Sequence, residues 1–374
     1  MSPKGIAILG SGIFAKEAHL PAVAALNSGV AELKAIYSRS EKSATELATA
    51  AQQSLNLNEP PSVYHDADPN ANIDALLARP DIAAVIIALP ITIQPSIVRK
   101  ALAAGKHVLS EKPVAPDVAS GIELINEYNT TYKPKGLIWR IAENFEIEPA
   151  YQTAAKMVRG GKVGKVGFFN ARVVGYVAKD NKYYNTPWRT IPDYQGGFLL
   201  DGGVHTVAAL RVLLPGTMVS LSGYASLNQP HLAPHDTINA TIQTTDGSHG
   251  LVELTFGSPV PSRSTLANSG ITVTGSEGWI SIVNASNADG KGVLRITVRT
   301  VTKDEKGRDN GETEEVIEEE VRGVKVEVAS FLDAINGSDD GFGEPLGALK
   351  DVAFIQAALN SNGAPVDLVK LVQQ

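Results

Sequence analysis

The chain has 374 residues, 43% of them apolar and 20% charged, with no cysteine and a formal net charge of −7. The length favours two domains. The acidic balance, with no compensating basic stripe, argues against a nucleic-acid partner, and the lack of cysteine excludes disulfides, thiolate metal ligands and a cysteine nucleophile. Apolar runs are too short to span a membrane, and the first strand begins by Gly5 with no room for a cleaved signal. We therefore expect a cytoplasmic protein with no membrane partner and no metal site.

A glycine-rich turn follows the first predicted strand. Gly10, Gly12 and Ala15 have the spacing GxGxxA, which supplies a tight turn, a side-chain-free approach for a pyrophosphate and close packing of a helix on the strand. Free backbone N–H groups at the start of the helix, predicted over 16–27, face the phosphates. A purely structural turn would look similar, but the flanking strand and helix favour dinucleotide binding. The residues predicted to contact the cofactor here are Gly10, Gly12, Ile13 and Phe14.

The end of the second predicted strand, residues 33–37, indicates which dinucleotide is bound. NAD-selective sites place an acidic residue here on the ribose 2′-hydroxyl. This chain has Ser38 and Arg39 instead, with Lys42 close behind, so a hydroxyl and two cations replace the carboxylate that would repel a 2′-phosphate. The cations are also typical of a solvated loop, but the missing carboxylate removes a specific contact to NAD. We predict NADP rather than NAD as the cofactor.

Helices and strands continue to alternate along the first part of the chain. The run 82–89 is apolar without alternation, as expected of a parallel strand buried on both faces. Loops at the carboxyl ends of such strands face the ligand, so Leu89, Pro90 and Gln94 are expected beside the nicotinamide. Helices are predicted over 41–55, 73–78, 95–104 and 118–128, and strands over 107–109 and 136–142.

The segment after the strand 107–109 carries Glu111-Lys112-Pro113, preceded by Gly105-Lys106-His107-Val108-Leu109. Together with the glycine turn, this segment resembles the signature of the glucose–fructose oxidoreductase/inositol dehydrogenase/MocA (GFO/IDH/MocA) family. The resemblance implies that Glu111 and Lys112 lie at the cofactor and that Lys112 also contacts substrate and serves catalysis. A cation near the reacting carbon stabilises the negative charge that builds up on the substrate oxygen. Without the resemblance, a lysine before a proline at a strand end is expected to be solvent-exposed.

The hydrophobic pattern of the sequence changes beyond residue 166. Alternating or β-branched segments are separated by turns such as Asp246-Gly247, which is typical of a large, mainly antiparallel sheet. We predict an α/β Rossmann dinucleotide-binding domain over 1–142 and an α+β domain over 143–374, an open sheet with helices on one face. The last helix, predicted over 346–360, is a candidate to pack back on the first domain. Strands are predicted over 167–177, 219–227, 237–245, 250–256, 271–274, 279–283, 293–302 and 313–321, and helices over 150–159, 204–213 and 324–336.

The second domain carries a long polar and aromatic loop, residues 176–195. A loop of this length in a compact domain is usually functional, and its aromatic side chains suit a sugar or diol as well as a subunit interface. Upstream, Asn144-Phe145 resembles the family, but Glu146 stands where the family often has a basic residue, which hints at a different preference for substrate charge.

The second group of candidate catalytic residues is Asp201 and His205, which follow the turn Gly196-Gly197. Their i, i+4 spacing places both on one side of a helix start. Oxidation of an alcohol needs a proton acceptor, and histidine is suited to that role near neutral pH, whereas Asp201 would bind the substrate hydroxyl or orient the imidazole. Taken singly, a histidine on a helix is more often structural, but the resemblance implies that Lys112, Asp201 and His205 form the catalytic set. The predicted substrate contacts are Lys112, Asn144, Tyr176, Trp188, Arg189, Asp201 and His205.

We expect an NADP-dependent oxidoreductase that transfers hydride between nicotinamide and a carbon of a sugar, sugar derivative, polyol or trans-diol. Two alternatives are a non-catalytic NADP-binding sensor of the same family and a glycosidase that recycles bound NAD. Gln94 stands where the family often has histidine, and Ala208 stands where it often has aspartate. The resemblance therefore does not indicate which family member's substrate this chain shares. The resemblance also implies a homodimer or homotetramer formed through the open sheet.

Overall fold

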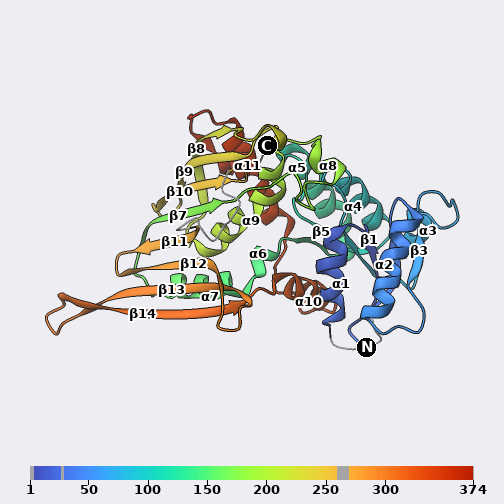
Figure 1. Ribbon diagram of the computed structural model, residues 1–374, viewed down its shortest axis with the longest axis horizontal. Coiled ribbons are helices and arrows are strands. Elements are labelled where there is room, and N and C mark those ends of the chain that lie inside the picture. The colour runs from blue at the N-terminus through green and yellow to red at the C-terminus, as the bar shows by residue number, and fades with distance from the viewer. Residues whose placement is uncertain (1–3, 27–28, 259–268, 374) are drawn as a thin grey trace. The chain divides into compact units, whose positions relative to one another are not determined.

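The computed structural model describes residues 4–26, 29–258 and 269–373. The chain forms two compact units, Met1–Asn144 with Val324–Leu349, and Phe145–Gly323 with Lys350–Gln374 (Figure 1). Residues 324–349, which the sequence analysis placed in the second domain, therefore lie in the first unit. The chain passes from the first unit to the second after residue 144, two residues beyond the predicted boundary.

The first unit contains a six-stranded parallel sheet in the order β3-β2-β1-β4-β5-β6. The two central strands are apolar and almost wholly buried, as a sheet covered on both faces requires. The strand order reverses between β1 and β4, so the carboxyl ends of these two strands are the expected ligand-binding edge. The predicted Rossmann architecture is confirmed. The strands are β1 (Lys4–Leu9), β2 (Ala31–Tyr37), β3 (Ser62–Tyr64), β4 (Ala84–Ile87), β5 (His107–Glu111) and β6 (Trp139–Ala142).

The helices of the first unit begin where the sequence supplies capping groups. Ser40, Asn72 and Asp117 each accept a hydrogen bond from a backbone N–H in the first turn of α2, α3 and α5. The first helix starts at Ile13, earlier than predicted, and it ends at Ala24, whereas Asn27 lies outside the described residues. The helices are η1 (a π-helical turn, Ala15–His19), α1 (Leu20–Ala24), α2 (Glu41–Ser54), α3 (Ile73–Leu77), α4 (Gln94–Ala103), α5 (Val118–Glu127), η2 (Tyr128–Tyr132) and η3 (Lys133–Lys135).

Helix α10 (Gly323–Ile335) returns the chain to the first unit and completes its core. Val328, Phe331 and Leu332 are at most 2% exposed and belong to the same apolar cluster as residues of β1, α1 and α2. Burial of side chains of this size contributes about 1.5–3 kcal/mol each. The segment that follows α10 is held by Arg140 of β6, whose buried side chain pairs with Asp339 at 2.5 Å and Glu344 at 2.8 Å.

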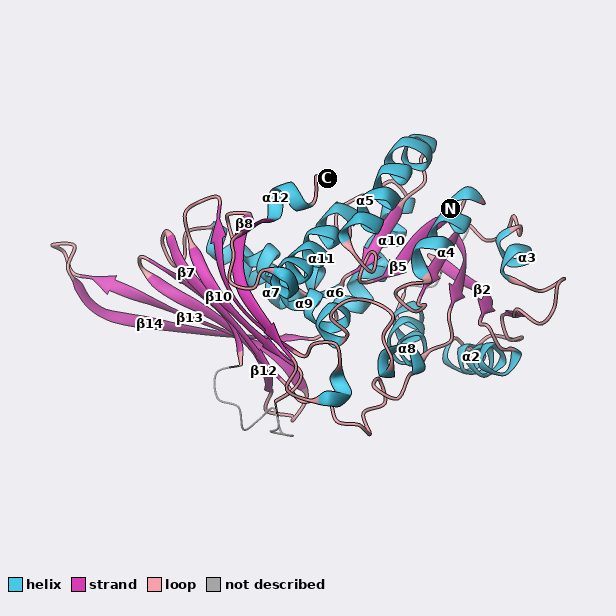
Figure 2. Cartoon of the chain, turned by 90° about the horizontal axis from the view of Figure 1, so that it is seen from above, coloured by secondary structure: helices cyan, strands magenta, loops and turns pink. Residues whose placement is uncertain are grey.

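The second unit is built on a nine-stranded sheet in the order β14-β13-β12-β11-β7-β10-β9-β8-β15. All neighbouring strands are antiparallel except β7 and β10, so the predicted mainly antiparallel sheet is confirmed. Figure 2 shows α7, α9 and α11 on one face of this sheet. The strands are β7 (Val166–Val174), β8 (Met218–Ser226), β9 (Thr237–Thr244), β10 (His249–Thr255), β11 (Gly270–Gly275), β12 (Gly278–Ser286), β13 (Gly292–Lys303), β14 (Asp309–Glu320) and β15 (Val366–Asp367). The helices are α6 (Asn144–Ile147), α7 (Pro149–Arg159), α8 (Pro187–Thr190), α9 (Phe198–Leu213), η4 (Pro230–Leu232), α11 (Pro345–Asn360) and α12 (Leu368–Leu371). Helices α6 and α11 each begin with residues of the first unit.

Helix α9 begins at Phe198, six residues earlier than predicted, and runs through Gly202 and Gly203. A Cβ at Gly202 would lie 3.0 Å from the Phe256 ring, and one at Gly203 would lie 2.6 Å from the Leu254 side chain. The two glycines let the helix approach β10 closely, and this packing outweighs their low helix propensity. Asp201 and His205 are therefore both fully within the helix.

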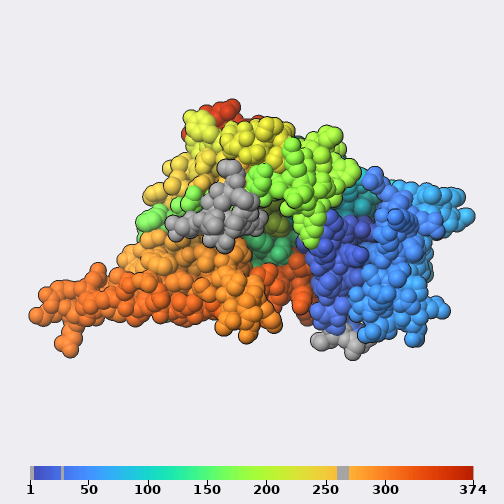
Figure 3. All heavy atoms as spheres, viewed as in Figure 1, coloured from blue at the N-terminus to red at the C-terminus, as the bar shows by residue number. Residues whose placement is uncertain are grey.

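The acidic stretch near residues 309–320 forms one side of a long hairpin, β13–β14, that projects as a narrow arm (Figure 3). Arg295 of β13 pairs with Glu318, and Arg299 pairs with Glu312 and Glu314. Cross-strand ion pairs therefore account for part of the acidic charge.

Candidate active site

Four strand ends of the first unit lie at the same edge of the parallel sheet. In the sheet register, Leu9 is opposite both Tyr37 and Ile87, and Ile87 is opposite Ser110. The residues just beyond these positions include those that the sequence analysis predicted to contact the cofactor. The structure thus brings Gly10, Ser38, Leu89 and Glu111 to the edge where the strand order reverses.

The glycine turn has the conformation and space that a pyrophosphate requires. Gly10 has φ +114°, and its N–H donates to the Tyr37 carbonyl at 2.8 Å, while a Cβ here would lie 2.1 Å from the Ala88 carbonyl oxygen. A Cβ on Gly12, in contrast, meets no described atom within 4 Å. Because the helix starts at Ile13, its first N–H groups have no partner within the helix. These donors and the open approach at Gly12 fit a dinucleotide phosphate.

The two glycines make a matched pair for testing this site. We expect Gly12→Val to weaken NADPH binding at least tenfold and to change the free energy of unfolding by less than about 1 kcal/mol. Gly10→Ala is expected to lower that free energy by about 1–3 kcal/mol, because a Cβ clashes with Ala88 and φ is positive. Nicotinamide fluorescence titration and urea denaturation measure the two effects. Unchanged NADPH affinity in Gly12→Val would contradict a pyrophosphate site at this turn.

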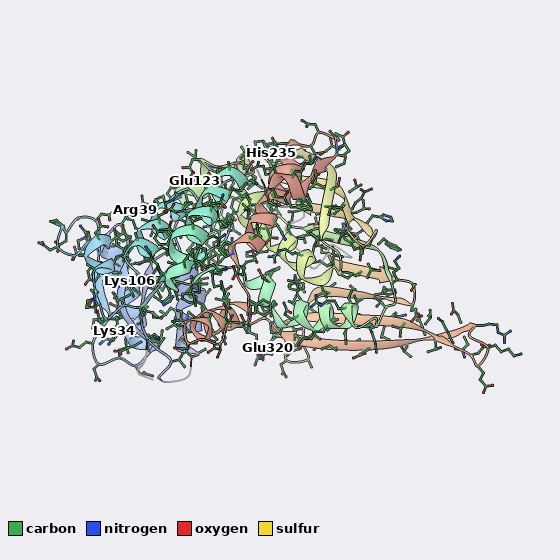
Figure 4. The ribbon with its side chains drawn as sticks, turned by 180° about the vertical axis from the view of Figure 1, so that it is seen from behind. Lys34, Arg39, Lys106, Glu123, His235 and Glu320 are labelled. Carbon is green, nitrogen blue, oxygen red and sulfur yellow. The ribbon has the colours of Figure 1, made fainter. Side chains whose placement is uncertain are left out.

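The end of β2 presents a hydroxyl and a cation to solvent. Ser38 is half-buried and Arg39 is exposed (Figure 4). The side chain of Lys42 is 87% exposed, with Glu46 4.0 Å away. A carboxylate also lies beside this corner, because Asp66 Oδ1 accepts a hydrogen bond from the Tyr37 hydroxyl at 2.6 Å. Burial and this bond raise the pKa of Tyr37. Asp66 follows a different strand, so the sequence analysis did not consider it.

Glu111 and Gln94, which we predicted to contact the cofactor, form internal hydrogen bonds. The Glu111 carboxylate is 2.7 Å from Nε2 of His19, and Gln94 Nε2 donates to the Glu111 carbonyl at 3.0 Å. Gln94 is only 2% exposed, whereas Lys112, the next residue after Glu111, is half-buried. The sequence analysis missed His19, because 92 positions separate it from Glu111 and no local pattern links them.

In the second unit, Asp201 is held by a residue of the 176–195 loop. Nε of Arg189 donates to Asp201 Oδ2 at 2.7 Å, and the two side chains are 15% and 9% exposed. The guanidinium also lies 3.9 Å from the centroid of the Trp188 ring and 5.4 Å from that of Tyr183. Two aromatic residues of the loop thus pack against the Arg189 guanidinium, and its bond to Asp201 ties the loop to α9. Tyr176, from the start of the loop, lines an open pocket of 440 Å³ with Lys179, Asp180, Gln229, Pro230 and His231.

His205 lies one turn after Asp201 on α9 and stacks on Phe145, with ring centroids 4.7 Å apart and planes at 25°. Phe145 in turn packs against Tyr151 of α7. His205 is half-buried, so an aromatic face supports the imidazole while part of it stays accessible. Asn144, the residue before Phe145, is half-buried and ends the first of the two chain segments that make up the first unit.

Glu146 forms an ion pair within the second unit. Its carboxylate is buried and lies 3.0 Å from Arg211, which also contacts Asp351 at 2.9 Å. Burial disfavours the guanidinium charge, but Asp351 and Glu146 outweigh it and raise the pKa of Arg211. The Glu146 carboxylate is therefore paired within the second unit, and the inferred change in the preference for substrate charge stays a prediction.

Comparison with known proteins shows the family of the chain. Residues 4–133 match the model for an oxidoreductase family with an NAD-binding Rossmann fold, and residues 151–281 match the GFO/IDH/MocA C-terminal domain. The chain belongs to the GFO/IDH/MocA family. The predicted family and the predicted oxidoreductase class are therefore confirmed.

Several GFO/IDH/MocA relatives cover most of the chain. Dehydrogenase FPY6 of Fusarium mangiferae is 40% identical over 367 residues, 96% of each chain. The dTDP-3,4-didehydro-2,6-dideoxy-alpha-D-glucose 3-reductase of Streptomyces violaceoruber is 29% identical over 73% of each chain. Among solved structures, an oxidoreductase of Thermotoga maritima superimposes with a TM-score of 0.81, 28% identity and 99% coverage of both chains.

The predicted catalytic residues of this GFO/IDH/MocA chain are divided between the units. Lys112 is in the first unit, whereas Asp201 and His205 are in the second, together with the predicted substrate contacts Tyr176, Trp188 and Arg189. Within the described ranges, no helix is long and apolar enough to cross a membrane.

Proposed function

We propose that this protein is an NADP-dependent oxidoreductase acting on a CH–OH or carbonyl carbon of a sugar, sugar derivative, polyol or trans-diol. The observation that carries the proposal is the edge of the parallel sheet where an open glycine turn follows β1, Ser38-Arg39 follows β2 and Lys112 follows β5. Membership of an oxidoreductase family supports hydride transfer. The relative from Streptomyces violaceoruber, named as a reductase of a dideoxy-glucose nucleotide, supports a sugar-like substrate.

The bound nicotinamide would supply or accept the hydride. We propose that the glycine turn and the first N–H groups of the following helix bind the pyrophosphate, and that Ser38 and Arg39 bind the 2′-phosphate. The Lys112 ammonium would stabilise negative charge on the substrate oxygen. His205 would exchange a proton with that oxygen, and Asp201, held by Arg189, would help to position the substrate or the imidazole.

The open face of the second sheet supports self-association. Phe168 of β7, Leu251 of β10 and Tyr224 of β8 are 53%, 52% and 66% exposed. The strand register places all three side chains on the face opposite the buried residues of these strands. Because large exposed apolar side chains on one face mark interaction surfaces, we propose a homodimer or homotetramer formed through this sheet.

Cofactor preference tests the proposal directly. We expect Arg39→Ala to weaken NADPH binding about tenfold or more and to leave NADH binding within about twofold, because only NADPH carries the 2′-phosphate that a guanidinium pairs with. Fluorescence titration with both dinucleotides measures the effect. Lys100→Ala is the matched control, because this exposed side chain pairs with Asp74 and was not predicted to contact the cofactor, so a small effect is expected.

The contrary outcome has a structural interpretation. If NADH binds more tightly than NADPH and Arg39→Ala changes neither affinity, the NADP assignment is wrong. Asp66 would then be the carboxylate to test for a ribose contact, because it lies beside the end of β2 through its bond to Tyr37. Tight NADPH binding would instead justify an NADP-coupled screen of aldoses, polyols and diols.

A further inference from the structure

A buried imidazole joins the helix that follows the glycine turn to the strand that precedes Lys112. His19 is fully buried and ends the π-helical turn η1, which begins three residues after Gly12. Its Nε2 lies 2.7 Å from Oε1 of Glu111, the last residue of β5. Both residues belong to the first unit, and Lys112 is the residue that follows Glu111.

The surroundings of His19 indicate which ring nitrogen carries the proton. The Glu111 carboxylate is an acceptor at Nε2, and Nδ1 is buried with no hydrogen-bond partner among the described residues. The Phe14 ring packs edge-on against the imidazole, with centroids 5.3 Å apart. A neutral ring with its hydrogen on Nε2 satisfies its only donor, whereas a hydrogen on Nδ1 would be a buried donor with no acceptor.

Glu111 is also held through its backbone. Gln94, at the start of α4, donates from Nε2 to the Glu111 carbonyl at 3.0 Å. The carboxylate and the carbonyl of Glu111 are therefore fixed by two different buried side chains. Because the Glu111 carbonyl and the Lys112 nitrogen form one planar peptide unit, fixing Glu111 at its side chain and its carbonyl gives Lys112 a defined backbone position.

We propose that His19 is a positioning residue for Lys112. Through the charge-assisted bond to Glu111, it keeps the Lys112 segment in place and joins it to the helix that follows the pyrophosphate-binding turn. This inference rests on the proposed function only for the catalytic importance of Lys112, because the His19–Glu111 bond and its effect on the position of the Lys112 segment do not require catalysis.

The test measures the chemical reactivity of individual lysines in the full chain. Trace acetylation with acetic anhydride, followed by mass spectrometry, gives a rate for each lysine in the unaltered protein and in His19→Leu and His19→Gln. Leucine is apolar and of suitable size for the buried site, whereas glutamine keeps an N–H donor. Lys106 is the internal standard, since its Nζ donates to the carbonyls of Arg79 and Ile82 in the same unit (Figure 4).

We expect His19→Leu to raise the acetylation rate of Lys112 about fivefold, the effect of one lost hydrogen bond, with Lys106 unchanged. His19→Gln is expected to restore a rate within about twofold of the unaltered protein. His107→Leu is the matched control, because it removes a half-buried histidine from the other end of β5. A merely structural role for His19 predicts equal effects of the two leucine variants, and that result overturns the proposal, as does an unchanged Lys112 rate in His19→Leu.

A second measurement applies if His19→Leu does not fold. Long-range ¹H–¹⁵N NMR of the unaltered protein reports which nitrogen of His19 is protonated. A hydrogen on Nε2 with an unprotonated Nδ1 supports the proposal, and a hydrogen on Nδ1 alone overturns it. Neither measurement needs turnover, so a catalytically dispensable Lys112 would refute the proposed function and leave this inference intact.

Discussion

Replacement of Lys112 by methionine is expected to lower kcat about a hundred- to a thousandfold with the substrate found by the NADP-coupled screen. The proposed role of the ammonium is to stabilise negative charge on the substrate oxygen in the transition state, and removal of one such group typically has an effect of this size. Methionine keeps the length and apolar stem of the side chain but not its charge. Steady-state kinetics with saturating NADPH measure the change.

The control for Lys112 is an exposed lysine of the same unit. Lys100 pairs with Asp74 at 2.9 Å and its side chain is 49% exposed, so Lys100→Met should leave kcat within about twofold. NADPH affinity of Lys112→Met should change much less than kcat, because the proposed contacts to the pyrophosphate and the 2′-phosphate come from the glycine turn and from Ser38 and Arg39. Turnover that survives in Lys112→Met would refute the proposed role of this residue.

Replacement of Arg211 by methionine is expected to lower the free energy of unfolding by about 3–5 kcal/mol, as is usual when one partner of a buried ion pair is removed. The variant leaves the carboxylates of Asp351 and Glu146, whose side chains are 1% and 11% exposed, without the guanidinium. Urea denaturation followed by circular dichroism measures the loss.

A variant in which Arg211, Glu146 and Asp351 are all replaced by uncharged residues distinguishes the effect of lost charge pairing on stability from the effect of lost packing. In Arg211→Met/Glu146→Gln/Asp351→Asn no buried charge of the cluster remains, and we expect at least half of the lost stability to return. Arg295→Met, which breaks a partly exposed pair with Glu318, should have a much smaller effect. A triple variant less stable than Arg211→Met would show that packing, and not uncompensated charge, explains the loss.

Much of the fold follows from patterns that are local in the chain. The unbroken apolar run 82–89 marks a strand buried on both faces, and the glycine spacing at Gly10 and Gly12 marks the turn that begins the first helix. The alternating segments beyond residue 166 correspond to the strands of the large sheet, with ends shifted by a few residues. Local periodicity and turn residues determine these elements, so a single sequence is enough to predict them.

The remaining features depend on contacts between distant parts of the chain. Glu146 looks like a substitution at a substrate site, but Arg211, 65 positions away, neutralises it. The sequence predicts the start of α9 too late, because Gly202 and Gly203 suggest a break in the helix. Their packing against Phe256 and Leu254 explains why the helix is continuous there. His19 and Glu111 likewise meet through the arrangement of strands, which no spacing in the sequence reveals.

The return of α10 to the first unit has a consequence for the evolution of this gene. A fragment that encodes only residues 1–144 would specify the parallel sheet without Val328, Phe331 and Leu332, which fill its core. A single recombination event between two relatives would therefore separate the sheet from part of its own interior. Exchange of cofactor preference between relatives requires two crossovers, or point substitutions at the sheet edge, and the latter route leaves the core intact.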